Sequence, residues 1–227
     1  MLPDSPQTQP RNRPFGLVAT VLLYLMLISG ISPAHAFISG FEHFPYGLLL
    51  VLVRGRMNMP ALLIYFAVFT YYLLSILYFG QGFSGSAASN LIQMLNFTAP
   101  LFFLRGNEAV IAKVAKHVFW AYIIVGSLQM LHILAPIEGL VQLLIARFSG
   151  DPIGGYRGVT MLETEPARAG YQLLMLYIVI TCTQVKTPMI LTVVLVGAQF
   201  AMIASTTGII LTTLYLGFVS APQVVRS

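Results

Sequence analysis

Charged residues are scarce in this chain of 227 residues: Asp, Glu, Lys and Arg together make up 8% of it, whereas hydrophobic residues make up 57%. A soluble domain carries roughly a quarter charged residues, because its surface has to be solvated. This shortage excludes an ordinary soluble domain and indicates an integral membrane protein. Cysteine is scarcer still. The chain has one, Cys182, which excludes an intramolecular disulfide.

The chain lacks the sequence patterns that are typical of several functional classes. The phosphate-loop pattern G-x-x-x-x-G-K-[ST] is absent, which argues against a nucleotide-driven motor. The net charge of +5 comes from cations that sit between apolar runs and do not form a basic stripe, so we expect no nucleic-acid partner. His35 and His43 have no cysteine or second histidine at ligand spacing. We therefore expect no metal site and no cofactor.

Apolar runs of membrane-spanning length follow one another along the chain. A bilayer core of about 30 Å needs roughly 20 helical residues. The runs that meet or approach this length are Phe15–Ser32, Ala61–Gly80, Ala87–Leu104, His117–Ile137 and Ala169–Val185.

Two further stretches complete the pattern. Phe44–Val53 is short and predicts a tilted or broken helix. Thr187–Val225 has no charge at all and is long enough for nearly two crossings, so we split it at Ser205–Gly208, where β-branched residues and glycine weaken a helix. The sequence thus predicts an all-α polytopic protein with about seven to eight spans. Its predicted parts are a cytoplasmic tail (1–14), the first five transmembrane helices (15–137), an extracytoplasmic loop (138–168) and the last two or three helices (169–227).

The first apolar run has a second interpretation. Cations precede it and the small residues of Pro33–Phe37 follow it, as in a signal peptide cleaved after Ala36. The run is long for a signal peptide and the rest of the chain is polytopic, so we favour a retained helix. Both interpretations place Phe37 outside.

The cations predict the orientation, because cytoplasmic loops are enriched in Lys and Arg. With the N-terminus in the cytoplasm, three cations fall outside, namely Arg147, Arg157 and Arg168. Nine fall inside: Arg11, Arg13, Arg54, Arg56, Arg105, Lys113, Lys116, Lys186 and Arg226. The long loop Glu138–Arg168 is therefore predicted to be external, with Val141–Phe148, too short to span, at the membrane surface.

This loop gathers charge immediately before an apolar run. Pro166 disfavours a helical Glu165 and suits the first turn of a helix, so we predict that a helix starts at Pro166 with Glu165 at or beside its N-cap. Arg168 then lies in the first turn, where the helix dipole opposes its charge. A cation in that place indicates either a nearby carboxylate partner or a bound anion.

Two interpretations of the loop remain open. In one it is a site for phosphate and sugar, where Arg157 and Arg168 bind a diphosphate through forked hydrogen bonds and Glu165 or Glu163 accepts a proton from a sugar hydroxyl. In the other it is an ordinary loop with solvated charges, because surface ion pairs are common and weak. Gln129 lies in the fifth run. We interpret its side chain as a hydrogen-bonding link between packed helices, without a catalytic role.

The same residues carry a resemblance to a known family. Arg157, followed by Glu165-Pro166-Ala167 and the start of an apolar helix, resembles the external-loop signature of bacterial polysaccharide polymerases of the O-antigen polymerase and ligase superfamily. Their usual form is close to R-x-x-G followed by E-P-S; here Thr160 stands near the expected glycine and Ala167 replaces the serine. The segment AMIASTTGIILTTL resembles the next feature of the family, a turn of small residues between two apolar runs.

The resemblance implies a function in polysaccharide biosynthesis. A glycosyltransferase-type polymerase of this kind lies in the bacterial inner membrane and joins oligosaccharide units carried on undecaprenyl diphosphate, on the periplasmic face. It implies Glu165 and Glu163 as candidate catalytic residues, Arg157 and Arg168 as candidate substrate-binding residues, and membrane lipid and other glycan-assembly proteins as partners. Members of the family continue through further helices, so we expect this chain alone to be an inactive fragment.

Two other classes stay open. A carrier or flippase for a lipid-linked or anionic solute would place charged residues within the spans as well as at their ends. A non-enzymatic membrane subunit would use the loop to bind a partner.

The predicted orientation can be tested at Ser149, within the external loop. A cysteine placed there by Ser149→Cys is expected to react with a membrane-impermeant thiol reagent in intact cells. Labelling that appears only after the cells are lysed would contradict the orientation.

Overall fold

The computed structural model describes residues 15–37, 42–54, 59–79, 91–93, 95–96, 106–150, 152, 158–183 and 189–224. Within these ranges the regular elements are helices, and the one strand-like contact is an isolated antiparallel bridge between Ile31 and Ile145. The predicted all-α class is confirmed for this part of the chain.

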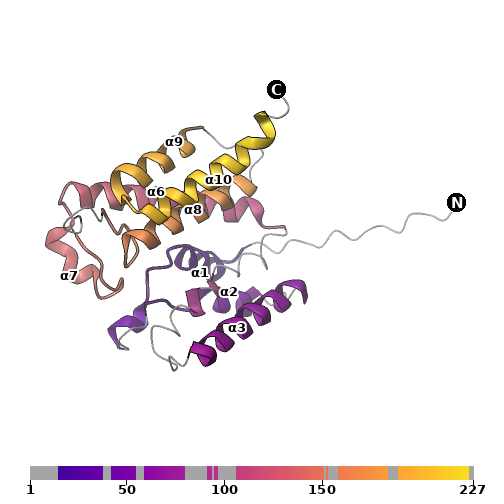
Figure 1. Ribbon diagram of the computed structural model, residues 1–227. Coiled ribbons are helices and arrows are strands. Elements are labelled where there is room, and N and C mark those ends of the chain that lie inside the picture. Colours follow the sequence, from indigo (N-terminus) through magenta and orange to yellow (C-terminus); the bar gives the residue numbers. More distant parts are fainter. Residues whose placement is uncertain are drawn as a thin grey trace.

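The described helices follow the apolar runs of the sequence. In chain order they are α1 (Leu17–Leu27), η1 (Pro33–Ala36), α2 (Tyr46–Arg54), α3 (Met59–Phe79), α6 (Glu108–Met130), η2 (Ala135–Ile137), α7 (Glu138–Val141), α8 (Pro166–Thr183), α9 (Met189–Gly197), η3 (Ala198–Ile203) and α10 (Thr206–Val224). Figure 1 shows α6, α8, α9 and α10 in one group and α1, α2 and α3 in another. Helix α1 contacts both α2 and α6 and so joins the two groups.

The core lies where α1, α6 and α8 meet. Leu23 of α1, Phe119 and Tyr122 of α6, and Leu173 and Ile180 of α8 are all buried and belong to one hydrophobic cluster. Large aromatic and aliphatic side chains contribute most to such a core, because each removes a large apolar area from its surroundings. The packing holds the loop that precedes α8 directly against the end of α1.

Helix α1 is shorter than the apolar run that predicts it. It ends at Leu27, and the chain then turns through Ser29 and Gly30. A Cβ atom at Gly30 would lie 2.1 Å from the carbonyl oxygen of Leu162, so only glycine allows the turn to approach the loop before α8 so closely. This turn brings Ser29 to Glu163.

Helix α6 is displaced from its predicted range of His117–Ile137. It begins at Glu108, where the Asn107 carbonyl accepts the first helical hydrogen bonds and the Glu108 carboxylate accepts one from the Gly106 amide. Lys113 and Lys116, which the orientation count places on the cytoplasmic side and which precede the predicted range, therefore lie within the helix. It ends at Met130, and His132 then takes a left-handed conformation (φ 59°) that stops the helix.

The uncharged run Thr187–Val225 divides into two helices as predicted, but the break lies at Ala204 and Ser205, and Thr206–Gly208 form the first turn of α10. Helix α9 continues into the π-helical turn η3, Ala204 adopts a left-handed conformation, and α10 begins at Thr206. The Ser205 carbonyl accepts a hydrogen bond from the Ile209 amide. Ser205 is thus the N-cap of α10, a position that serine favours.

Helices α8 and α10 cross closely at two glycines. A Cβ atom at Gly208 would lie 3.3 Å from the Gly170 Cα, and the Gln199 side-chain amide donates to the Gly170 carbonyl over 2.8 Å. Small residues allow helix backbones to approach in this way. The contact fixes α10 against the first turns of α8.

The predicted count of seven to eight spans is not supported by the helix lengths. Among the described residues, α6 is the one helix long and apolar enough to cross a membrane by itself, whereas other apolar helices, such as α1, are shorter. The run Ala87–Leu104 lies largely outside the described residues. Val141–Phe148 is only partly a surface segment, because Leu143 and Leu144 are exposed whereas Ile145 and Phe148 are buried.

Candidate functional site

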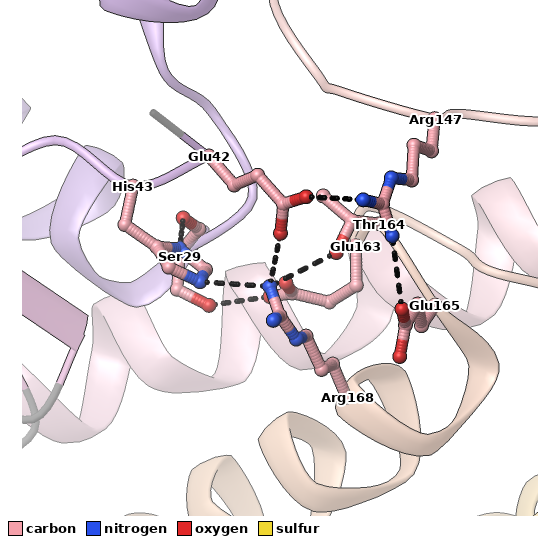
Figure 2. A network of polar contacts seen from close by, with 8 residues as sticks. All are labelled: Ser29, Glu42, His43, Arg147, Glu163, Thr164, Glu165 and Arg168. Carbon is pink, nitrogen blue, oxygen red and sulfur yellow. Dashed lines mark hydrogen bonds and ion pairs between the residues drawn. The ribbon is translucent and has the colours of Figure 1, made fainter. Parts of the chain in front are cut away.

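The candidate site forms at the N-terminus of α8. The helix begins at Pro166, and the Ala169 amide donates to the Glu165 carbonyl over 3.0 Å, so Glu165 is its N-cap as predicted. Arg168 lies one turn in. Figure 2 shows the polar network around it, which consists of Ser29, Glu42, His43, Arg147, Glu163, Thr164, Glu165 and Arg168.

Arg168 is held by residues from two distant parts of the chain. Its Nη1 lies 2.6 Å from Glu42 Oε2, 3.1 Å from His43 Nε2 and 3.1 Å from Thr164 Oγ1. The side chain is 25% exposed, and that of Glu42 is 12% exposed. Of the two partners that the sequence left open for this arginine, a carboxylate and an anion, the structure therefore provides the carboxylate.

Arg147 extends the network toward the surface. Its Nη2 lies 3.3 Å from Glu42 Oε1 and its Nη1 lies 3.2 Å from Glu165 Oε1, so the charges alternate from Arg168 through Glu42 and Arg147 to Glu165. The Arg147 side chain is 65% exposed, and its backbone is left-handed with φ 56°. Such a conformation is uncommon for a residue other than glycine and is found at functional sites.

His43 connects the arginine to the end of α1. It is fully buried, its Nδ1 lies 3.0 Å from the Ser29 carbonyl, and its Nε2 faces Arg168. A carbonyl can only accept and a guanidinium can only donate, so we assign a proton to Nδ1 and none to Nε2. Burial lowers the pKa of His43, and the Arg168 charge lowers it further. The imidazole is therefore neutral.

Glu163 lies beneath the network and is fully buried. The Ser29 hydroxyl donates to Glu163 Oε1, and the Tyr122 hydroxyl donates to the same atom over 2.7 Å. Oε2 has no hydrogen-bond partner among the described residues. Burial raises the pKa of Glu163 because it penalises the charged form, although the two hydroxyl donors act in the opposite direction. Because Oε1 already accepts two hydrogen bonds, Oε2 is the oxygen on which this carboxyl group would take up a proton.

The structure thus brings together some of the residues that the sequence predicts. Glu165 and Arg168 belong to the same ion-pair network, and Glu163 lies behind it without access to solvent. Arg157 lies outside the described residues. Gln129 is buried and bonds the Ser149 carbonyl, Thr160 and the Met161 amide, which agrees with its interpretation as a bond between packed segments.

Sequence reasoning missed the contribution of the first third of the chain. Glu42 is the only acidic residue between Asp4 and Glu108, and this isolation beside an apolar run was the available signal. Arg147 was predicted only to be one of three external cations, without a role in the site. Nothing in the sequence places either residue beside Arg168.

No protein-family model, curated protein or solved structure matches this chain. Over the ranges that the structure describes, no group of three or more His, Cys, Asp or Glu side chains could hold a metal ion. The chemistry open to the site is that of its arginines and carboxylates: binding an anion, and accepting a proton at the exposed Glu165.

Glu163→Gln tests the buried acid. Because burial raises the pKa of Glu163 in the folded chain, its stabilising contribution is complete below the ordinary value of 4.5 and is lost as the pH rises through the raised value. The amide of the variant cannot ionise. We expect similar unfolding free energies near pH 4 and an advantage of about 1–3 kcal/mol for the variant near pH 9.

Thermal or denaturant unfolding of the purified chain across this pH range measures the difference. Glu165→Gln, at an exposed carboxylate of the same loop, is the matched control, and the advantage near pH 9 should be larger for Glu163→Gln than for this variant. Parallel profiles for Glu163→Gln and the wild type would show that Glu163 is ionised in the folded chain.

Proposed function

We propose that this chain is a multi-pass protein of a bacterial inner membrane and, in its complete form, a glycan polymerase that joins lipid-diphosphate-linked oligosaccharide units on the periplasmic face. The observation that carries the proposal is the polar network at the start of α8. It gathers two arginines and an exposed carboxylate at the Glu165-Pro166 motif on which the family resemblance rests. These are the groups that transfer from a diphosphate requires.

Exposed apolar side chains support the membrane part of the proposal. Soluble monomers rarely expose large contiguous apolar patches. Here the exposed large hydrophobic residues include side chains of the following helices: Leu17 and Val18 of α1, Leu63, Phe66, Leu74 and Leu77 of α3, Ile124 of α6, and Ile210, Leu214 and Phe218 of α10. A lipid environment would solvate them, and α1 and α9 would cross as short or broken segments.

The proposed reaction is a displacement at a sugar carbon. A hydroxyl of the acceptor sugar attacks the anomeric carbon of the donor sugar, a new glycosidic C–O bond forms, and the bond from that carbon to the diphosphate oxygen breaks. The diphosphate leaves with the bonding electron pair. Arg168 and Arg147 stabilise its developing charge, and Glu165 accepts the proton of the attacking hydroxyl.

Exposure favours Glu165 over Glu163 as the base. The Glu165 side chain is 48% exposed, whereas Glu163 is fully buried. A base must come within hydrogen-bond distance of the proton that it accepts. Glu163 instead supports the loop from below, through Ser29 and Tyr122.

Glycan formation in a bacterium that lacks its own polymerase tests the proposal. With the complete form of the protein, Glu165→Gln is expected to reduce long glycan chains by about 100-fold or more, the usual contribution of a general base. Arg168→Lys should also impair the reaction, because lysine cannot reproduce the planar fork of arginine. Gel analysis of chain length and a membrane immunoblot measure product and protein.

Glu108→Gln, at an exposed carboxylate at the start of α6, is the matched control and should leave the glycan pattern unchanged. Normal polymer from both site variants would contradict the proposal and would favour the interpretation of this segment as an ordinary charged loop. Single repeat units that reach the periplasm without elongation, in the wild type as well, would favour a carrier.

A further inference from the structure

The carboxylate of Glu42 lies between two guanidinium groups. Its Oε2 lies 2.6 Å from Arg168 and its Oε1 lies 3.3 Å from Arg147. Figure 2 shows Glu42 entering from the segment before α2, with one oxygen directed at each arginine. Two oxygens of a phosphate would bridge a pair of arginines in the same way, since guanidinium groups bind carboxylate and phosphate through the same donors.

Among the described residues, the ion-paired groups of the network carry no net charge. Arg147 and Arg168 supply two positive charges, which Glu42 and Glu165 balance. Burial lowers the pKa of His43 and raises that of Glu163, which disfavours a further charge at either residue. We propose that Glu42 is a built-in anion that occupies the arginine pair, and that a diphosphate binds by displacing it; this inference rests on the proposed function for the nature of the ligand.

The two arginines differ in how firmly they hold Glu42. Arg168 is three-quarters buried, contacts Glu42 at 2.6 Å and is also held by His43 and Thr164. Arg147 is 65% exposed, and its two ion-pair contacts are longer, at 3.2 and 3.3 Å. Exposed pairs of this kind contribute little stability. The entering diphosphate therefore replaces the carboxylates of Glu42 and Glu165 as the partner of Arg147, while the Arg168 side chain keeps its position.

Arg168 also has donors to spare for a ligand. In the described part of the chain, all its hydrogen bonds use Nη1. Nε and Nη2 form the side-on fork of the guanidinium group, which matches two oxygens of a phosphate. The residues before and after Arg147, namely Ile145, Ala146 and Phe148, are buried and anchor its backbone, while its side chain is exposed.

Calorimetric titration of the purified full chain in detergent with inorganic pyrophosphate tests the inference. Removing a negative charge beside a bound anion strengthens binding, so Glu42→Gln is expected to bind pyrophosphate about tenfold more tightly than the wild type. Arg147→Gln is expected to bind it about tenfold more weakly. Lys113→Gln removes the same charge from an exposed position on α6 and should bind as the wild type does.

Weaker or unchanged binding by Glu42→Gln would overturn the inference, as would equal affinities for Arg147→Gln and Lys113→Gln. Should Glu42→Gln not yield folded protein, the comparison of these two exposed positions decides the matter. The outcome is separate from the polymerase test. Tighter binding by Glu42→Gln without glycan formation would support the anion site and reject the polymerase, and the reverse result would reject only the role of Glu42.

Discussion

The ion pair between Arg168 and Glu42 is the contact on which the candidate site depends. It joins the first turn of α8 to the segment before α2 across 126 positions of the sequence. Both side chains are largely buried, so each charge needs the other, because an unpaired charge in such a place is costly. Arg147 contacts Glu42, and His43 contacts Arg168. Glu165 joins the network through Arg147.

Beneath the ion pair, a buried acid supports the same loop. Glu163 accepts hydrogen bonds from Ser29, at the end of α1, and from Tyr122, in the middle of α6. These contacts join the loop before α8 to α6 and to the turn after α1. Glu163 and Glu165, two positions apart in the sequence, thus lie in different environments: Glu165 is exposed and ion-paired, whereas burial raises the pKa of Glu163.

The start of α8 and the break before α10 could be predicted from the sequence, because each depends on residues at that position of the chain. Pro166 specifies the start of α8, and the Ser205 region specifies the break before α10, because proline and small hydroxyl residues act on their own backbone. The partners of Arg168 could not be predicted in this way. The Glu42 contact depends on the packing of α1 against α6 and on the close turn at Gly30, which are properties of the assembled chain. The start of α6 was missed although its contacts are local: the Asn107 carbonyl accepts the first helical hydrogen bonds, and the Glu108 carboxylate accepts one from the Gly106 amide.

A double-mutant cycle on Glu42 and Arg168 tests the central claim most directly. The free energy of unfolding is measured for the wild type, Glu42→Gln, Arg168→Gln and the double variant. If the pair organises the site, each single variant loses about 1–3 kcal/mol, and the double variant loses less than the sum by 1 kcal/mol or more, an amount on the order of the coupling between contacting residues. Strictly additive losses would contradict the account, because they would show that the two side chains do not stabilise one another in the folded chain.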